Sequence, residues 1–168
     1  MAMKGDLSQL GLRSLKEDPL KTVEERLARL MNGKGKERTD TLRREMQSLM
    51  MEFGSVFREE KGLEKGIEKI RDLKGRYMDV VVVNQGKAFN YDRVEAIELG
   101  HQLDLAEVIL FSALHRKESR GGHFREDYSA RDDQNYLKHT LVFKTTKGLE
   151  VRYKPVKITR FQPEARVY

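Results

Sequence analysis

Apolar residues recur every three or four positions along four long segments, and this spacing most constrains the fold of the chain. The first such series is Leu20, Val23, Leu27 and Leu30. Spacing of this kind places the apolar side chains on one face of a helix. Because such a helix must bury its apolar face against another element, we expect a mainly α protein built as a helical bundle.

Local signals set the expected ends of the helices. Asp18-Pro19 suits a helix start, with the acid as N-cap and proline at the first helical position, and Asn32-Gly33 suits its end. We expect further helices over residues 39–60, 62–77 and 92–117. The apolar stripe of the second helix comprises Leu42, Met46, Leu49, Met50, Phe53, Val56 and Phe57.

The expected helix over residues 92–117 is the longest, and its apolar face is the broadest. Asp92 and Glu95 have the spacing of a capping box at its start. The apolar positions are Val94, Ile97, Leu103, Ala106, Ile109, Leu110, Ala113 and Leu114. A face this wide implies contacts on more than one side, so the helix should lie centrally in the bundle.

The remaining segments do not follow a helical period. Leu141–Phe143 and Val151–Tyr153 flank Lys147-Gly148 and predict a small β-hairpin, followed by an extended tail. Residues 80–86 suit either a small hairpin or an extended loop. We therefore expect a leader over residues 1–17, a helical bundle over residues 18–118, and a polar elbow, hairpin and extended tail over residues 119–168.

The positive charge of the chain is concentrated at one end. The net charge is +6, yet residues 1–137 hold 25 basic and 25 acidic side chains, while residues 138–168 hold eight basic and two acidic ones. This distribution argues against a nucleic-acid partner for most of the chain and suggests that the tail meets an acidic surface or water. With no cysteine, no apolar run of membrane length and no signal-peptide pattern, we expect a soluble intracellular protein.

Common catalytic and cofactor-binding motifs are absent from the sequence. Gly33-Lys34-Gly35 lacks the third glycine of a dinucleotide-binding fingerprint, and no P-loop, H-E-x-x-H or G-x-S-x-G occurs. Asp127, Ser129, Arg131 and Asp133 have calcium-loop spacing, but an arginine occupies a ligand position. The four histidines form no cluster. We therefore assign no catalytic, cofactor-binding or metal-ligating residue, and we expect the chain alone to bind no FAD.

The stretch after the longest helix is dense in opposite charges. Residues 116–133 hold five basic and five acidic side chains, and Gly121-Gly122 permits a sharp turn. Arginine–carboxylate forks are possible inside the chain or across an interface. A solvated, salt-bridged loop is the simpler alternative.

Two motifs in this stretch carry a family resemblance. R-K-E-S-R-G-G-H-F-R-E-D-Y over residues 116–128 and R-D-D-Q-N-Y-L-K-H-T-L over residues 131–141 resemble the C-terminal domain of the flavoprotein subunit of succinate dehydrogenases and fumarate reductases. Residues 42–58, Tyr153–Val156 and Pro163–Tyr168 extend the resemblance over about residues 18–168. The first motif is shared with L-aspartate oxidase, whose C-terminal domain is an alternative, but the second argues for the succinate/fumarate branch.

The resemblance implies a three-helix, spectrin-repeat-like bundle whose extension packs on a flavin domain. In that family an N-terminal Rossmann-like domain binds FAD and a capping domain closes over the dicarboxylate. None of their motifs occurs here, so FAD belongs to the parent subunit and the chain alone should be inactive. The implied partners are those two domains and an iron–sulfur subunit, without nucleic acid. The implied location is cytoplasmic, on the inner face of the membrane only through the complex.

The resemblance also implies residues that dock on the flavin domain: Arg120, His123, Arg125, Arg131, Asp132, Lys138, His139, Arg166 and Tyr168. Arg120 and His123 flank two glycines at the end of the longest helix, so we expect them to point outward and to stay exposed when the second surface is missing. A different class of function, a stand-alone basic helical module that binds nucleic acid or an acidic protein, rests only on the +6 charge.

Overall fold

The computed structural model describes residue 18 and residues 20–164, so the expected leader over residues 1–17 lies outside the described part. The long helices are α1 (Lys21–Asn32), α2 (Thr39–Phe53), α3 (Glu60–Tyr77) and α4 (Tyr91–His115). The shorter elements are β1 (Phe57–Arg58), β2 (Phe124–Arg125), the 3₁₀ turn η2 (Glu126–Tyr128), α5 (Asp133–Tyr136), β3 (Lys138–Thr145) and β4 (Gly148–Pro155). The expected mainly α fold with a small β-hairpin is confirmed.

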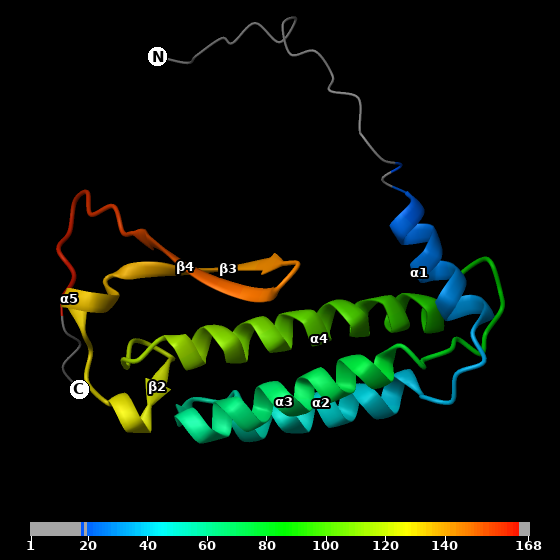
Figure 1. Cartoon of the computed structure of the whole chain (residues 1–168), viewed down its shortest axis with the longest axis horizontal. Coiled ribbons are helices and arrows are strands. Elements are labelled where there is room, and N and C mark those ends of the chain that lie inside the picture. Colours follow the sequence, from blue (N-terminus) through cyan, green and yellow to red (C-terminus); the bar gives the residue numbers. More distant parts are fainter. Residues whose placement is uncertain (1–17, 19, 165–168) are drawn as a thin grey trace, which may run out of the picture.

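Helices α2, α3 and α4 lie side by side and alternate in direction, which makes a three-helix bundle (Figure 1). Helix α1 leans against the end of the bundle where α4 begins, and the hairpin of β3 and β4 lies along α4. Helix α4 thus contacts the other three long helices and both strands of the hairpin. The central position expected from its broad apolar face is confirmed. No helix of residues 18 and 20–164 combines the length and hydropathy that a membrane crossing requires.

The core of the bundle is made of aliphatic side chains, many of them from the predicted stripes, although Leu99 was not among the predicted positions and the predicted Val94 and Ile109 are 47% and 46% exposed. Leu42, Leu63, Ile70, Leu99 and Leu103 have no exposed surface. Burial of one such side chain contributes about 1.5–3 kcal/mol. The fully or nearly fully buried apolar set also includes Leu30, Met46, Phe53, Ile67, Leu73, Tyr77, Val80, Val82, Ala96, Ala106, Leu110 and Ala113.

Glycine allows α3 and α4 to approach closely. A Cβ atom on Gly100 of α4 would lie 2.6 Å from the hydroxyl oxygen of Tyr77. That hydroxyl donates a hydrogen bond of 2.9 Å to the carbonyl oxygen of Ala96, one turn earlier in α4. The ring of Tyr77 therefore lies directly on the helix backbone, in space that only a residue without a side chain leaves open.

Helix α2 ends seven residues earlier than expected. It stops at Phe53, where the Gly54 amide donates to the carbonyl oxygen of Met50, and the chain then turns into β1. The Arg58 guanidinium donates back to the carbonyl oxygens of Gly54 and Ser55, at 2.8 and 2.6 Å. Phe57, assigned to the apolar stripe, is 68% exposed. The assignment was wrong because glycine ends the helix and the next residues pair with β2 instead.

The start of α4 also differs from the expected capping box. Asn90, not Asp92, is the N-cap, and its side-chain oxygen accepts a hydrogen bond of 3.0 Å from the Arg93 amide. The side-chain amide of Asn90 donates to the carbonyl oxygens of Asn84 and Gly86. Asparagine can both accept and donate, so one residue caps the helix and fixes the preceding loop. Of the two alternatives for residues 80–86, the extended loop is the one observed.

The hairpin of β3 and β4 follows the prediction. The two strands are antiparallel, Val142 lies opposite Val151, and Thr145 lies opposite Gly148 at the turn. Gly148 has a φ of 116°, a conformation that glycine adopts without strain. From Val156 to Glu164 the chain has no helix or strand, as expected for an extended tail.

Candidate functional site

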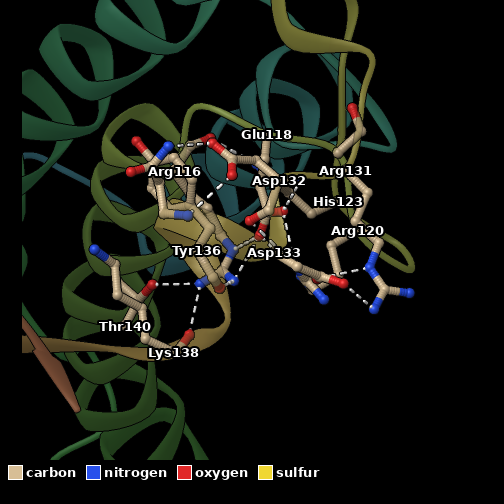
Figure 2. Close-up of polar contacts among 12 residues, drawn as sticks. Arg116, Glu118, Arg120, His123, Arg131, Asp132, Asp133, Tyr136, Lys138 and Thr140 are labelled. Carbon is tan, nitrogen blue, oxygen red and sulfur yellow. Dashed lines mark hydrogen bonds and ion pairs between the residues drawn. The ribbon is translucent and has the colours of Figure 1, made fainter. Parts of the chain in front are cut away.

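Glu118 is the centre of a network of ion pairs just beyond the end of α4 (Figure 2). Its side chain is fully buried, and its carboxylate accepts hydrogen bonds from Arg116, from Arg120 and from the Asp132 amide, at 2.7–3.0 Å. Burial by itself raises the pKa of Glu118, but the bonds from Arg120, the Asp132 amide and Arg116 outweigh it and lower the pKa below 4.5. The carboxylate is therefore a permanently charged anchor at neutral pH.

Arg116 uses all five of its N–H groups within the chain. Two of them bond to Glu118. The others donate to the carbonyl oxygens of Tyr136 and Lys138 and to the Thr140 hydroxyl, at 2.6, 3.1 and 2.9 Å. Arg116 thus joins the end of α4 to α5 and to the start of β3, so the hairpin is held in place by a side chain from the bundle.

Arg120, Asp133 and Arg131 extend the network toward the tail. Asp133 accepts from Arg120 at 2.6 Å and from Arg131 at 2.8 and 2.6 Å. These bonds, from Arg131 first and then Arg120, lower the pKa of Asp133 to about 2. Arg131 also donates to the carbonyl oxygen of Glu164. Asp132 caps α5 by accepting from the Asn135 amide at 2.9 Å.

Arg125 links the end of α4 to the start of α3 through hydrogen bonds. Its side chain is fully buried and donates to the carbonyl oxygens of Ala113 and Leu114 at the end of α4, at 2.9 and 3.0 Å. The same guanidinium forms a two-point fork with Asp127, at 2.7 and 2.6 Å, and Asp127 accepts from the Glu60 amide at the start of α3. Orphan groups at both helix ends are thereby satisfied.

His123 lies between two arginines and is held in one tautomer. Its Nδ1 is 2.7 Å from Nη1 of Arg58, and its Nε2 is 3.0 Å from the carbonyl oxygen of Arg116. Arginine can only donate, so Nδ1 accepts and Nε2 carries the proton that it donates to the carbonyl. Burial lowers the pKa of His123, and the charge of Arg58 lowers it further, although the bond to the Arg116 carbonyl opposes this. The neutral ring, with both nitrogens hydrogen-bonded, therefore holds the Arg58 guanidinium and the Arg116 backbone at a fixed separation.

Five of the predicted docking residues therefore meet in one place, together with partners that the sequence did not single out. We call the set the elbow network: Arg116, Glu118, Arg120, His123, Arg125, Asp127, Arg131, Asp132 and Asp133. The prediction that Arg120 and His123 point outward is wrong. Arg120 has a side chain only 26% exposed and is bonded to Glu118 and Asp133, since these carboxylates lie on its own elbow.

The other predicted docking residues lie elsewhere. Lys138 and His139 begin β3, and Arg166 and Tyr168 lie outside the described residues. Sequence reasoning missed Glu118; the Arg-x-Glu-x-Arg alternation of residues 116–120 could have indicated its pairing with Arg116 and Arg120, although not its burial. In the part of the chain that the structure describes, no three His, Asp or Glu side chains are grouped as a metal site would require.

The fold and the elbow network define a helical domain. The charged groups of the network bond mainly to one another and to nearby backbone, so they stabilise the domain itself. Residues 43–168 match the family model described as the fumarate reductase flavoprotein C-terminal domain. The chain belongs to this family, the C-terminal domains of fumarate reductase and succinate dehydrogenase flavoprotein subunits.

Relatives with known functions support the same assignment. The fumarate reductase flavoprotein subunit of Haemophilus influenzae is 44% identical over 149 residues, which is 88% of this chain and 25% of that protein. The succinate dehydrogenase flavoprotein subunit of Rickettsia conorii is 39% identical over 153 residues, 90% of this chain and 26% of that protein. The chain thus spans about a quarter of the length of these curated relatives.

Solved structures share the fold. A structure of Escherichia coli quinol fumarate reductase matches 96% of this chain and 28% of its own chain, with a TM-score of 0.86 and 39% identity. Adenylylsulfate reductase of Archaeoglobus fulgidus matches 85% of this chain and 25% of its own, with a TM-score of 0.74 but 17% identity. The second likeness shows that the fold alone tolerates very different sequences.

Proposed function

We propose that the chain acts as the C-terminal helical domain of an FAD-dependent flavoprotein that interconverts succinate and fumarate. The observation that carries the proposal is the match over 96% of the chain to Escherichia coli quinol fumarate reductase. The reaction takes place in other parts of the parent subunit, where FAD and the dicarboxylate bind. The contribution of this chain is to pack on the flavin-binding part, within a complex whose iron–sulfur subunit receives the electrons.

The elbow network supports this role because it makes the end of the bundle a rigid platform. Forks among its charged groups fix the direction in which the hairpin and the tail leave the bundle. We propose that Lys138 and His139, with Arg166 and Tyr168, make direct contact with the flavin-binding part. His123, Arg125, Arg131 and Asp132 would hold the platform that presents them, and Arg120 would both hold the platform and face the pocket beside Lys138. The location that follows is cytoplasmic, with the membrane reached only through the complex.

A domain exchange tests the proposal. The fumarate reductase flavoprotein subunit of Escherichia coli is 42% identical to this chain over 149 residues, and this chain would replace the matching C-terminal segment. We expect the chimaera to retain FAD and to reduce fumarate, measured by flavin absorbance and by oxidation of a reduced dye. Circular dichroism establishes that the chimaera is folded.

The matching segment of Archaeoglobus fulgidus adenylylsulfate reductase is the control, because it has the same fold with little sequence in common. It should lose FAD. A folded chimaera with this chain that neither holds FAD nor turns over contradicts the proposal. Equal activity of both chimaeras would show that any bundle of this shape suffices.

A further inference from the structure

A pocket of about 360 Å³ lies where α5 leads into β3, beside the elbow network. Its lining residues are Arg116, Arg120, Tyr136, Leu137, Lys138, His139, Thr140 and Val156. They come from the end of α4, the elbow, the end of α5, the first three residues of β3 and the start of the tail. None of the lining side chains is acidic, so the pocket presents cations and hydrogen-bond donors without a carboxylate on its wall.

Two of these cations retain unused donors within the described part of the chain. Arg120 bonds through Nε and Nη2, which leaves Nη1 without a hydrogen-bond partner there. The Lys138 ammonium likewise makes no ion pair with a described residue; it lies 3.9 Å from the ring centroid of Tyr153 and 5.2 Å from that of Tyr136. These rings stand nearly perpendicular, with centroids 6.4 Å apart.

Cation–π contact with two rings positions the ammonium without neutralising it. The Lys138 carbonyl is also bonded to Arg116, which fixes the backbone of the same residue. Lys138 is therefore a pre-organised cation on the wall of the pocket, and a pre-organised group loses less conformational entropy when it binds.

The charge balance of the surrounding groups selects the kind of ligand. Three cations line the pocket, and two of them, Arg116 and Arg120, are paired with the carboxylates of Glu118 and Asp133. One positive charge remains, that of Lys138. A single carboxylate neutralises it, whereas a dicarboxylate or a phosphate dianion would bring an excess negative charge close to Glu118 and Asp133.

We propose that this pocket receives one carboxylate, the side chain of an Asp or Glu on the flavin-binding part of the subunit. The inference rests on the proposed function and names the contact by which this domain docks. The neighbouring sequence supports an acidic partner, because the whole positive excess of the chain lies in residues 138–168, which begin at this pocket. Lys138 supplies the charge, and Arg120 Nη1 supplies a second donor.

Zero-length carbodiimide coupling in the FAD-loaded chimaera tests the contact directly, because it joins a lysine amine to a carboxylate that touches it. We expect mass spectrometry to find Lys138 linked to an Asp or Glu of the flavin-binding part. Lys138→Met keeps the stem and removes the charge, and should raise the rate of FAD loss about tenfold or more. Lys157→Met, an exposed lysine of the tail outside the pocket, is the matched control and should leave that rate unchanged.

Other outcomes overturn the inference. The pocket contact is rejected if the chimaera is active but Lys138 is not cross-linked to the flavin-binding part. It is also rejected if Lys138→Met and Lys157→Met lose FAD at the same rate. In both cases the proposed function still stands. A chimaera that is folded but binds no FAD contradicts both the pocket contact and the proposed function. In the chain alone, succinate that shifts the NMR signals of Tyr153 and Lys138 at low millimolar concentration would make the pocket a small-molecule site instead.

Discussion

The bundle of α2, α3 and α4 and the elbow network are adjacent in the chain, yet different forces hold them. Fully buried side chains in the bundle are mostly leucines and isoleucines, whereas the fully buried large side chains of the elbow network are Glu118 and Arg125. The bundle admits a charged group at one nearly buried position, Glu107, which is paired with Arg71 and Lys74.

The two regions should therefore respond differently to substitution. Apolar burial is non-directional and scales with area, so a core position tolerates another side chain of similar size. A buried charge needs its partner at the right distance and angle, and loss of that partner leaves the charge unpaired. Four predictions for the whole chain, measured as the free energy of unfolding in urea, put this contrast to the test.

Arg125→Met should have the largest effect, a loss of about 3–5 kcal/mol. The substitution leaves the Asp127 carboxylate without its fork and two carbonyl oxygens of α4 without donors. Lys154→Met, on an exposed strand position, should change the free energy by less than about 0.5 kcal/mol. A loss at Arg125 no greater than that of the control would mean that the elbow network adds nothing to stability.

Leu103→Ala probes the bundle and should cost about 3 kcal/mol, because it opens a cavity in the core. Leu105, two positions along the same helix, is 59% exposed, whereas Leu103 has no exposed surface. Leu105→Ala should therefore cost less than about 0.5 kcal/mol. Similar losses for the two leucines would contradict the assignment of the inner face of α4.

Gly100→Ala should destabilise the bundle by about 1–3 kcal/mol, since the new methyl group meets the Tyr77 hydroxyl. Gly75 in α3 has no atom within 4 Å of its would-be Cβ. Gly75→Ala should accordingly stabilise the chain by up to about 1 kcal/mol through helix propensity. The opposite signs are the test, and a loss at both positions would show that the close contact with Tyr77 is not what requires glycine.

The smallest effect concerns pH and is confined to the elbow network. Because the pKa of His123 is lowered below 6.5, the folded chain takes up this proton at lower pH than the unfolded chain does. The contribution of His123 is present above pH 6.5 and is lost as the pH falls through the folded pKa. In His123→Gln, the free energy of unfolding should therefore fall less steeply below pH 6.5 than in the unsubstituted chain. An identical slope in the two proteins would contradict the assignment of a neutral His123 ring.

Much of this comparison could be anticipated from the sequence. The spacing of leucines and isoleucines gave α3 and most of α4, and the Lys147-Gly148 signal gave the hairpin. The same reasoning extended α2 too far, because Val56 and Phe57 continue its apolar period beyond Gly54. Periodicity reports where a helix is possible, but a glycine followed by a new pairing partner decided where it ends.

For the elbow, the sequence predicted the kinds of charged side chain present but not their arrangement. Equal numbers of acids and bases in residues 116–133 indicated forks but not which groups pair. Arg120 could be read as projecting outward because its partner Asp133 is thirteen positions away, and its pairing depends on the turn at Gly121. Glu118 carried no signal of burial, since glutamate is exposed in most proteins.

The sequence by itself determined that the four long helices and the hairpin exist, and to which family the chain belongs, because periodicity, turn residues and motif letters are properties of neighbouring positions. The tertiary structure decided that Arg125 joins the ends of α3 and α4, and that His123 is a neutral ring held between Arg58 and the Arg116 carbonyl. It also decided that, among the cations lining the pocket, Lys138 alone has no carboxylate partner in the described residues. These facts depend on groups distant in the chain coming within about 3 Å, where hydrogen bonds form and burial removes competing water.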